Sequence, residues 1–467
     1  MALHNKFFWG LLFFLIGVLF SSLIVDWEGA LLISVLFALL LALLFFVLGK
    51  RTFAVLVLFS ILGSSYFIWD DLRYRAKDKL SDEFSGEAKV VHIRARESYL
   101  EADFATAQGK IRAYVDRSEG IGFGDTVLIE AELKELSEES KRYFEKEGVH
   151  ALASYPEIEV LEKRSGLRRN LYAFRDKVAN VFPKYLDGEK AVFMTGITLG
   201  RSTGFSNELN EKLSATGTTH LVALSGFNVM IIARGIALVL GFLLLSRKLS
   251  FFLSILAIFL FVVMTGAEAS VTRAGIMAAL ILWADYSEEI FSVRNPLVFT
   301  ALIMVLFNPK ILAFDLGFQL SFLALIGIVY LRPILERWLR LSGRSFLAWK
   351  ENLSMTLSAQ LMVLPLILFS FGFMPAFSVL TNVLILTFIP FTMLFGLLIV
   401  LTNLISSLLA SFFAFFANIL LSYELAVIDF FSNFPFGIRI EALSLWILLA
   451  VYAFFFLLIY NKTNAPA

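Results

Sequence analysis

Long apolar runs alternate with short polar connections along most of the chain. A run of about 18 or more apolar residues can cross the hydrocarbon core of a bilayer as a helix. The pattern therefore predicts a polytopic α-helical membrane protein. The expected spans are Phe7–Val25, Ala30–Leu48, Thr52–Trp69, Leu221–Leu245, Phe251–Thr265, Val271–Ala284, Leu297–Phe307, Leu316–Tyr330, Leu353–Phe371, Phe377–Leu401 and Ala442–Tyr460. The apolar run Phe412–Phe434 contains Asn418, Glu424 and Asp429, and we expect it to be interfacial or partly re-entrant.

One long water-soluble stretch interrupts this pattern, from Asp70 to about Lys184. Five runs in it alternate apolar and polar residues, as half-buried strands do. They are AKVVHIRAR, YLEADFATA, GKIRAYVDR, DTVLIEAELKEL and HALASYPEIEVLEK. The segment Gly120–Asp125 supplies a glycine-rich turn before the long fourth run. The stretch is therefore expected to form a small all-β domain, an OB-like barrel, inserted into the membrane protein.

OB barrels often bind single-stranded nucleic acid through aromatic stacking and a basic groove. The candidate DNA-binding face of this domain combines three basic and three aromatic residues: Arg94, Arg96, Arg112, Tyr99, Phe104 and Tyr114. The alternative is an ordinary barrel core with solvated charges. The near-balance of acidic and basic residues in this stretch argues against strong nucleic-acid binding.

The pattern divides the chain into four parts. Residues 1–69 form a three-span membrane segment, 70–165 the OB-like domain, 166–218 amphipathic or interfacial helices, and 219–467 the larger transmembrane domain. In the third part, Gly166–Tyr185 carries apolar residues on one side and basic residues largely on the other. Such a helix is typical of a membrane surface.

Basic residues in the short connections predict the orientation. Lys50 and Arg51 follow the second span, Arg247 and Lys248 follow the fourth, and the loop Arg332–Lys350 is basic. Positively charged loops lie preferentially in the cytoplasm. We therefore expect a multi-pass protein of the inner (plasma) membrane with a cytoplasmic N-terminus and an extracytoplasmic β domain. The first apolar run lacks a small-residue cleavage site and leads directly into the second, so it is interpreted as an anchor rather than a signal peptide.

Composition narrows the chemistry. Only 17% of residues are charged, against about a quarter in soluble proteins, which agrees with the membrane class. Cysteine is absent and the four histidines are scattered, so disulfides, thiolate metal sites and a His-rich metallohydrolase site are excluded. No phosphate-binding glycine loop ending in Lys-Ser/Thr occurs, so no ATPase is expected. We expect no cofactor.

Polar or helix-loosening residues interrupt the apolar segments at four places. Such groups are costly at membrane depth unless they meet a partner or a wet cavity. They are His220, Ser225, Gly226 and Asn228; then Glu268, Ser270 and Arg273; then Asp315, Gln319 and Ser321; and finally Gln360 and Asn382. Nearby glycine and proline residues allow broken helices whose backbone lines a cavity.

Two of these groups have alternative explanations. Arg273 either forms a structural ion pair with Glu268 or Asp315, or faces a translocating anion. His220 and Ser225 lie roughly 140° apart around a helix. A hydrolytic pair needs hydrogen-bond reach, so hydrogen bonds to neighbouring helices are favoured for both.

These polar segments resemble, in order, those of the ComEC-type competence family, the inner-membrane channel for incoming DNA. The matching segments are LGRSTGFSNELNEKLSATGTTHLVALSGFNV, ASVTRAGIM, NPKILAFDLGFQLSFLALIGIVYL and SAQLMVLPLILFSFGFMPAFSVLTN, which cover roughly Leu199–Asn382. Asn228 stands where the family usually has His. Many members also carry a C-terminal metallo-β-lactamase-like domain, whereas this sequence ends at Ala467 without an HxHxDH motif. The resemblance therefore implies a channel without its own nuclease.

The function implied by the resemblance is passage of single-stranded DNA to the cytoplasm along a wet, polar route. The implied lining is His220, Ser225, Gly226, Asn228, Glu268, Ser270, Arg273, Asp315, Gln319, Ser321, Gln360 and Asn382. Implied partners are single-stranded DNA, the lipid bilayer, an outer-face DNA receptor, a cytoplasmic helicase or motor, and a separate nuclease. Two rival functions stay open: a transporter or flippase for another polar or lipid-linked substrate, and a membrane scaffold that uses the outer β domain.

Overall fold

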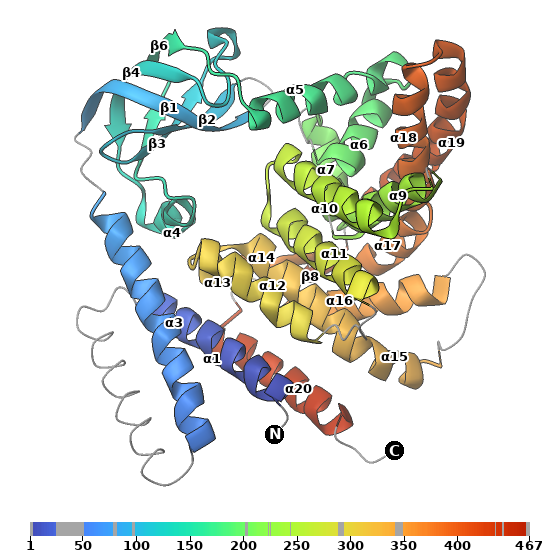
Figure 1. Ribbon diagram of the computed structural model, residues 1–467. Coiled ribbons are helices and arrows are strands. Elements are labelled where there is room, and N and C mark those ends of the chain that lie inside the picture. Colours follow the sequence, from blue (N-terminus) through green and yellow to red (C-terminus); the bar gives the residue numbers. More distant parts are fainter. Residues whose placement is uncertain are drawn as a thin grey trace. The chain divides into compact units, whose positions relative to one another are not determined.

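The computed structural model describes residues 3–24, 51–77, 82–95, 99–200, 204–222, 224, 226–242, 244–287, 294–340, 349–434, 436–440 and 443–463. It divides into two compact units (Figure 1). The first comprises Met1–Leu171 and Ile276–Phe318, and the second Tyr172–Gly275 and Gln319–Ala467.

Four helices of the first unit are α1 (Leu3–Ile24), α3 (Arg51–Arg75), α12 (Arg294–Phe307) and α13 (Ile311–Phe314). Helices α1 and α3 touch backbone to backbone. A Cβ on Gly17 would lie 1.9 Å from the carbonyl oxygen of Ser60, and one on Gly63 would lie 2.0 Å from that of Phe14. Small residues allow such close approach between membrane helices. The span predicted at Ala30–Leu48 lies outside the described residues.

Six strands form the β domain: β1 (Glu83–Ala95), β2 (Leu100–Ala105), β3 (Lys110–Val115), β4 (Thr126–Lys134), β5 (Ala151–Ser154) and β6 (Glu157–Glu162). Their order is β1-β2-β3-β5-β4-β6, and β1 also pairs with β4, which closes five strands into a barrel (Figure 1). The pairing of β3 with β5 is parallel. Phe104, Ile111 and Val127 fill the barrel core and are fully buried. The OB-like barrel predicted by the alternating runs is confirmed.

Two details of the barrel differ from the prediction. The fifth run is two strands, because the chain turns sharply at Tyr155, whose φ is 49°, before Pro156 removes a backbone donor. Helix α4 (Glu138–Lys146), between β4 and β5, was not predicted. The glycine-rich turn was predicted and is present, with short η1 (Arg117–Glu119) leading into it. Asp125 at its end is fully buried and accepts from the backbone N–H of Gly122 at 2.8 Å.

Helices dominate the second unit. In chain order, and including three helices that continue into or from the first unit, its elements are α5 (Leu167–Ala179), η2 (Phe182–Lys184), α6 (Gly188–Leu199), α7 (Asn207–Ala215), α8 (Thr219–Val222), α9 (Gly226–Phe242), α10 (Arg247–Met264), α11 (Ala269–Ser287), α14 (Leu316–Ile326), the π-helical turn η3 (Gly327–Leu331), α15 (Arg332–Trp338), α16 (Trp349–Phe371), β7 (Phe373–Pro375), α17 (Ser378–Leu386), α18 (Ile389–Asn403), α19 (Ser407–Ser432), β8 (Gly437–Arg439) and α20 (Leu445–Thr463). The amphipathic helix expected within Gly166–Tyr185 corresponds to α5.

Five described helices are long and apolar enough to cross a membrane, which confirms a multi-pass protein. They are Phe53–Arg75, Arg247–Met264, Leu316–Trp338, Trp349–Phe371 and Ser407–Ser432. A sixth candidate is the pair α17–α18, bent by 46° at a short break. This pair corresponds to the span predicted at Phe377–Leu401. Helix α19 is continuous and is one of these five candidates, which favours a full crossing over the re-entrant segment expected at Phe412–Phe434.

Candidate functional site

The segment that begins α9 is held by backbone contacts. The side chain of Asn228 is buried, and its Nδ2 donates to the carbonyl oxygens of Ile197 at 3.0 Å and Leu221 at 3.4 Å. His220 lies in α8, where its Nδ1 is 3.1 Å from the carbonyl oxygen of Gly217. Since a carbonyl only accepts, Nδ1 carries the proton. Ser225 lies outside the described residues. Asn228 thus joins α9 to α6 and α8.

Arg273 of α11 contacts a backbone carbonyl and an aromatic ring rather than a carboxylate. Its Nη1 donates to the carbonyl oxygen of Ser321, and its guanidinium lies 5.8 Å from the ring centre of Phe322. Its Nε and the Ser321 hydroxyl are buried without hydrogen-bond partners. A Cβ on Gly226 would lie 2.8 Å from Nη2, so the glycine admits the guanidinium. In the described part of the chain no carboxylate pairs with Arg273.

A second cluster surrounds the start of α17. Ser378 Oγ donates to Gln360 Oε1 at 3.3 Å, and Asn382 Nδ2 donates to the carbonyl oxygen of Ser378 at 2.7 Å. Asn382 is buried, and its Oδ1 has no partner. Gly217 abuts the cluster with φ of +67°, and a Cβ there would meet the Ser378 side chain at 2.7 Å. The structure therefore brings Gln360 and Asn382 together, next to the turn that precedes His220.

The remaining predicted lining residues are placed separately. Glu268 is exposed just before α11, Ser270 is half-buried in its first turn, and Gln319 is half-buried in α14. Asp315 belongs to the first unit. There its carboxylate accepts from the backbone N–H of Phe318 at 2.8 Å and pairs with Lys146 at 3.0 Å. Asp315 thus has a cationic partner in its own unit, and the Arg273–Asp315 ion pair stays a prediction.

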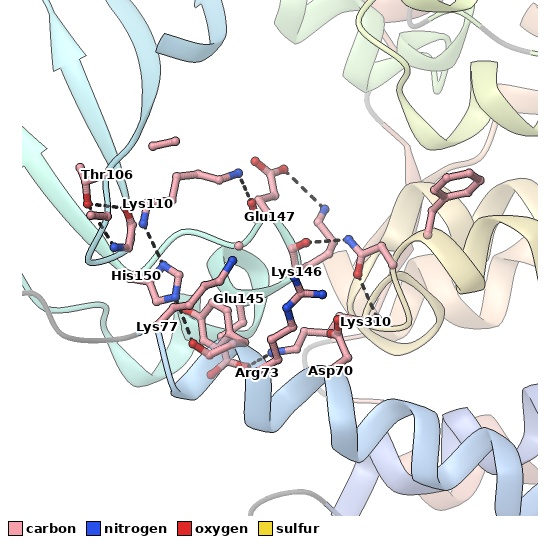
Figure 2. Close-up of a pocket in the computed structure, with 17 residues that line it drawn as sticks. Asp70, Arg73, Lys77, Thr106, Lys110, Glu145, Lys146, Glu147, His150 and Lys310 are labelled. Carbon is pink, nitrogen blue, oxygen red and sulfur yellow. Dashed lines mark hydrogen bonds and ion pairs between the residues drawn. The ribbon is translucent and has the colours of Figure 1, made fainter. Parts of the chain in front are cut away.

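A polar pocket of about 490 Å³ lies within the first unit. Figure 2 shows that its walls come from the end of α3, the β2–β3 turn, the segment between α4 and β5, and the α12–α13 connection. None of the twelve predicted lining residues borders it. Its charged lining has five basic and three acidic side chains, an excess of two positive charges: Arg73, Lys77, Lys110, Lys146, Lys310, Asp70, Glu145 and Glu147.

Aromatic and ionic contacts fix the pocket wall. The rings of Tyr74 and His150 stack with centres 4.3 Å apart, and the Tyr74 hydroxyl donates to the carbonyl oxygen of Val149 at 2.6 Å. Lys310 is 2% exposed and pairs with Asp71 at 2.9 Å. These contacts attach the barrel to α3, and α3 to the α12–α13 connection.

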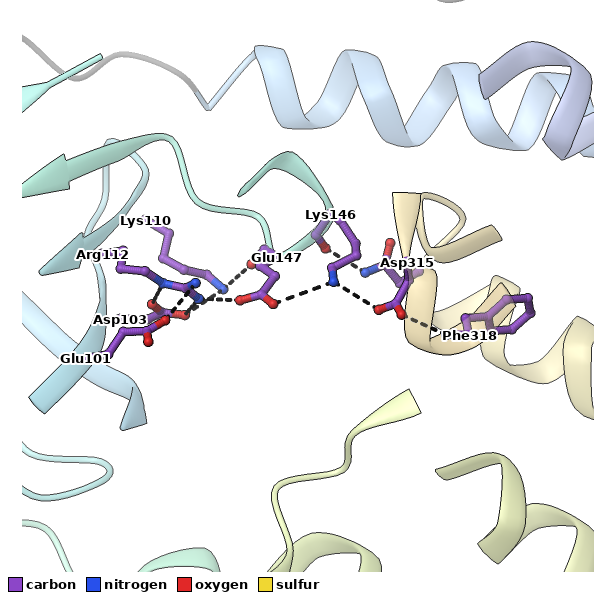
Figure 3. A network of polar contacts seen from close by, with 9 residues as sticks. Glu101, Asp103, Lys110, Arg112, Lys146, Glu147, Asp315 and Phe318 are labelled. Atoms are coloured by element: carbon purple, nitrogen blue, oxygen red, sulfur yellow. Dashed lines mark hydrogen bonds and ion pairs between the residues drawn. The ribbon is translucent and has the colours of Figure 1, made fainter. Parts of the chain in front are cut away.

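A chain of polar contacts runs from the barrel to the start of α14 (Figure 3). Arg112 binds Asp103 through two hydrogen bonds, Nε–Oδ1 at 2.6 Å and Nη2–Oδ2 at 3.0 Å, and also binds Glu147. Glu147 lies 3.7 Å from Lys146, which pairs with Asp315. Since Asp315 caps α14, the chain links the barrel interior to that helix terminus.

The charged groups in this series of polar contacts stabilise one another. Burial alone would lower the pKa of Arg112, but the carboxylates of Asp103 and Glu147 raise it well above its ordinary value. Burial would raise the pKa of Glu147, but the Arg112 guanidinium holds it below its ordinary value. The contribution of Glu147 to stability is therefore present above its unfolded pKa and lost as the pH falls.

The proposed DNA-binding face of the barrel needs correction at two positions. Phe104 is fully buried in the core, and Arg112 is 2% exposed among carboxylates, so neither side chain is available to a strand. Tyr99 and Tyr114 form a partly exposed edge-to-face pair with ring centres 5.3 Å apart, and Arg94 is half-buried. Arg96 lies outside the described residues.

Two buried charged groups were not predicted as site residues. Lys310 follows Pro309, a residue type that disfavours a continuing helix, and the local sequence does not indicate a buried cation there. Glu424 of α19 is fully buried, and its Oε1 accepts from the hydroxyl of Thr392 at 2.5 Å. A carboxyl inside an apolar run can indicate a buried functional group, but the prediction used Glu424 only as evidence for an interfacial or re-entrant segment. Within the described ranges no three His, Cys, Asp or Glu side chains gather as a metal site.

Comparisons with known proteins match the part of the chain that contains the polar segments of the second unit. The family model described as "Competence protein" matches residues 197–464, more than half of the chain. "ComE operon protein 3" of Bacillus subtilis (strain 168) is 25% identical over 254 residues, which are 54% of this chain and 32% of that relative. The match thus spans about a third of the relative's length. No solved structure is significantly similar to the chain.

Proposed function

This chain belongs to the competence protein family, and we propose that it forms the membrane route by which single-stranded DNA enters the cytoplasm during natural transformation. The observation that carries the proposal is the family match over 197–464, which includes Arg273, Gln360 and Asn382. DNA uptake is the context of that family, and the route through this chain is our inference.

The chemistry of Arg273 supports transport of an anion. A cation in an apolar interior is costly unless it meets an opposite charge. In the described part of the chain, Arg273 has no carboxylate partner and its Nε has no acceptor. A passing phosphate supplies both the charge and the acceptor oxygens, since guanidinium and phosphate pair well. One such contact is weak enough to release the strand after each step.

We place the N-terminus in the cytoplasm and the barrel outside, because the basic connections follow the positive-inside pattern. An outer-face receptor would then deliver DNA to the barrel side, and a cytoplasmic motor would pull the strand. The chain itself acts without catalysis in this proposal. Since the chain lacks cysteine, single-cysteine variants test orientation cleanly. A thiol at Ser118 should react with a membrane-impermeant reagent in intact cells, and one at Lys248 should not.

DNA uptake tests the proposal directly. Cells lacking their own copy receive wild type, Arg273→Gln or the matched Arg247→Gln, whose arginine is exposed at the start of α10. We expect Arg273→Gln to lower labelled DNA inside the cytoplasm by about tenfold or more, equivalent to about 1.4 kcal/mol. Surface-held DNA and protein level should stay unchanged, and Arg247→Gln should resemble wild type. Normal uptake in cells without the protein would contradict the proposal.

Reconstitution separates the rival functions. Purified protein in liposomes should carry a labelled single-stranded oligonucleotide to a compartment protected from external nuclease. Movement of a labelled lipid without the oligonucleotide would identify a flippase. Failure of both, with a partner protein held by the barrel, would identify a scaffold.

A further inference from the structure

Glu424 is a carboxyl group buried deep in a membrane helix. It lies in α19, eight residues before the helix ends at Ser432, which is about 12 Å along the axis. The residue is fully buried. Its Oε1 accepts from Thr392, and its Oε2 is buried without a hydrogen-bond partner. An ionised carboxylate needs donors on both oxygens, so this environment favours the neutral acid.

Among the residues that the structure describes, no positive charge compensates an ionised Glu424. Helices α17 and α18, which pack on α19, contain no charged residue. The other helices packed on α19 are α6 and α7, and their basic residues are engaged elsewhere: Lys190 donates to Asn418, and Lys212 pairs with Asp429 and Glu208. Their further carboxylates, Glu189 and Glu211, would only repel a second negative charge. The neighbouring Tyr423 directs its hydroxyl to the carbonyl oxygen of Leu384 at 3.5 Å.

The partner of Glu424 lies beside a break in a membrane helix. Thr392 is fully buried in the first turn of α18, just after the 46° bend between α17 and α18. Its Oγ1 lies 2.5 Å from Glu424 Oε1 and 3.3 Å from the carbonyl oxygen of Phe388, the residue that precedes α18. One hydroxyl proton cannot serve both acceptors fully, so the state of Glu424 decides which one it serves.

We propose that Glu424 is a proton-binding site of the membrane domain, and that Thr392 transmits its protonation state to the α17–α18 break. When Glu424 is ionised, the Thr392 hydroxyl donates to Oε1. When a proton from the aqueous phase binds Oε1, that O–H donates to Thr392 Oγ1, and the hydroxyl turns to the Phe388 carbonyl. Oε2 is then an uncharged carbonyl oxygen, the form that a site without donors tolerates best. A metal cation is a poor occupant, because three side-chain oxygens fall short of its ligand requirement.

Broken helices at membrane depth are where transport proteins place ion sites. Here protonation adds or removes a hydrogen bond on a carbonyl at the break. A protonated site therefore favours one geometry of the first turn of α18, and an ionised site favours another. The site does not depend on which substrate the membrane domain carries.

Carbodiimide labelling tests the site. Dicyclohexylcarbodiimide reacts with protonated carboxyls in apolar surroundings, and the adduct is located by peptide mass spectrometry on the full chain in lipid nanodiscs. At neutral pH we expect an adduct on the peptide containing Glu424 and none on Glu208, which is 72% exposed at its side chain. Labelling should decrease as the pH rises, and Glu424→Gln should abolish it while leaving the protein monodisperse.

Two further measurements test the proton site and the role of Thr392 separately. The infrared carbonyl band of a protonated acid should be present in wild type and in Glu208→Gln and absent from Glu424→Gln. Absence of both band and adduct in a monodisperse wild-type protein overturns the proton site. Thr392→Val keeps the shape of the side chain but removes the donor, and it should raise the pH of half-labelling by about one unit. An unchanged midpoint overturns the role of Thr392.

Discussion

Removing the guanidinium of Arg112 should unfold the barrel before any other part of the first unit. Arg112 lies on β3 and is 2% exposed. It contacts three carboxylates, Glu101 at 3.0 Å, Asp103 at 2.6 Å and Glu147. In Arg112→Met these carboxylates lose their main cation while those of Glu101 and Asp103 stay buried. The substitution also keeps most of the aliphatic volume, so loss of charge dominates its effect.

The magnitude follows from the burial of the partners. The side chains of Asp103 and Glu101 are 3% and 9% exposed, whereas that of Glu147 is 25% exposed and can turn toward water. Breaking a buried ion pair by removing one partner typically costs about 3–5 kcal/mol. Each 1.4 kcal/mol is a factor of ten, so local opening of the barrel should become about 100- to 4,000-fold more frequent.

Hydrogen exchange on the detergent-solubilised full chain measures this opening. Amides of β2 and β3 should exchange faster in Arg112→Met, whereas those of α19 should not change. The matched control is Lys134→Met, an exposed side chain at the end of β4, for which we expect a change within about 0.5 kcal/mol. Unchanged exchange in β2 and β3 of Arg112→Met would refute the structural role given to this arginine.

Two further predictions concern helix packing and pH. Gly17→Ala should destabilise the contact of α1 with α3 by about 1–3 kcal/mol or more, because its Cβ would overlap a carbonyl oxygen. The control is Gly10→Ala, whose Cβ would meet only a side chain at 3.4 Å and should be tolerated. Thermal unfolding of the two variants tests this difference. Burial lowers the pKa of His92 below 6.5, so the unfolded chain binds the extra proton first. Barrel stability from this source is therefore full above about pH 6.5 and decreases as the pH falls. His92→Gln should weaken the dependence of barrel hydrogen exchange on pH between about pH 7 and pH 5, and an unaltered dependence would contradict it.

Periodicity predicted the architecture well, because it reports which faces are buried. Apolar runs located the membrane helices, and alternation located the strands. Alternation also indicates the inward face of β2, since Ala102 and Phe104 share it and are both fully buried. Placing Phe104 on an exposed DNA-binding face conflicted with that pattern, so this error was avoidable.

The error at Arg112 had a different cause. Arg112 points to the outer face of its strand, opposite Asp103 on β2, and alternation predicts solvent there. Helix α4 covers that face, with the ring of Phe144 centred 5.7 Å from the guanidinium. The sequence of α4, EESKRYFEK, is largely charged. Its short polar pattern does not distinguish a helix from a loop, so the burial of Arg112 depended on a tertiary contact that periodicity does not encode.

Buried charges divide into two kinds across the described residues, and the division bears on function. In the first unit, Arg112 and Lys310 each pair with a carboxylate, so their presence is explained by structure. In the second unit, Glu424 is fully buried and Arg273 is half-buried with its Nε atom enclosed, and neither meets an opposite charge among the described residues. An unpaired buried charge destabilises a fold, and a neutral side chain of similar shape would remove that cost. Structure therefore gives no reason for these two residues. A ligand of opposite charge for Arg273 and a proton for Glu424 do give one.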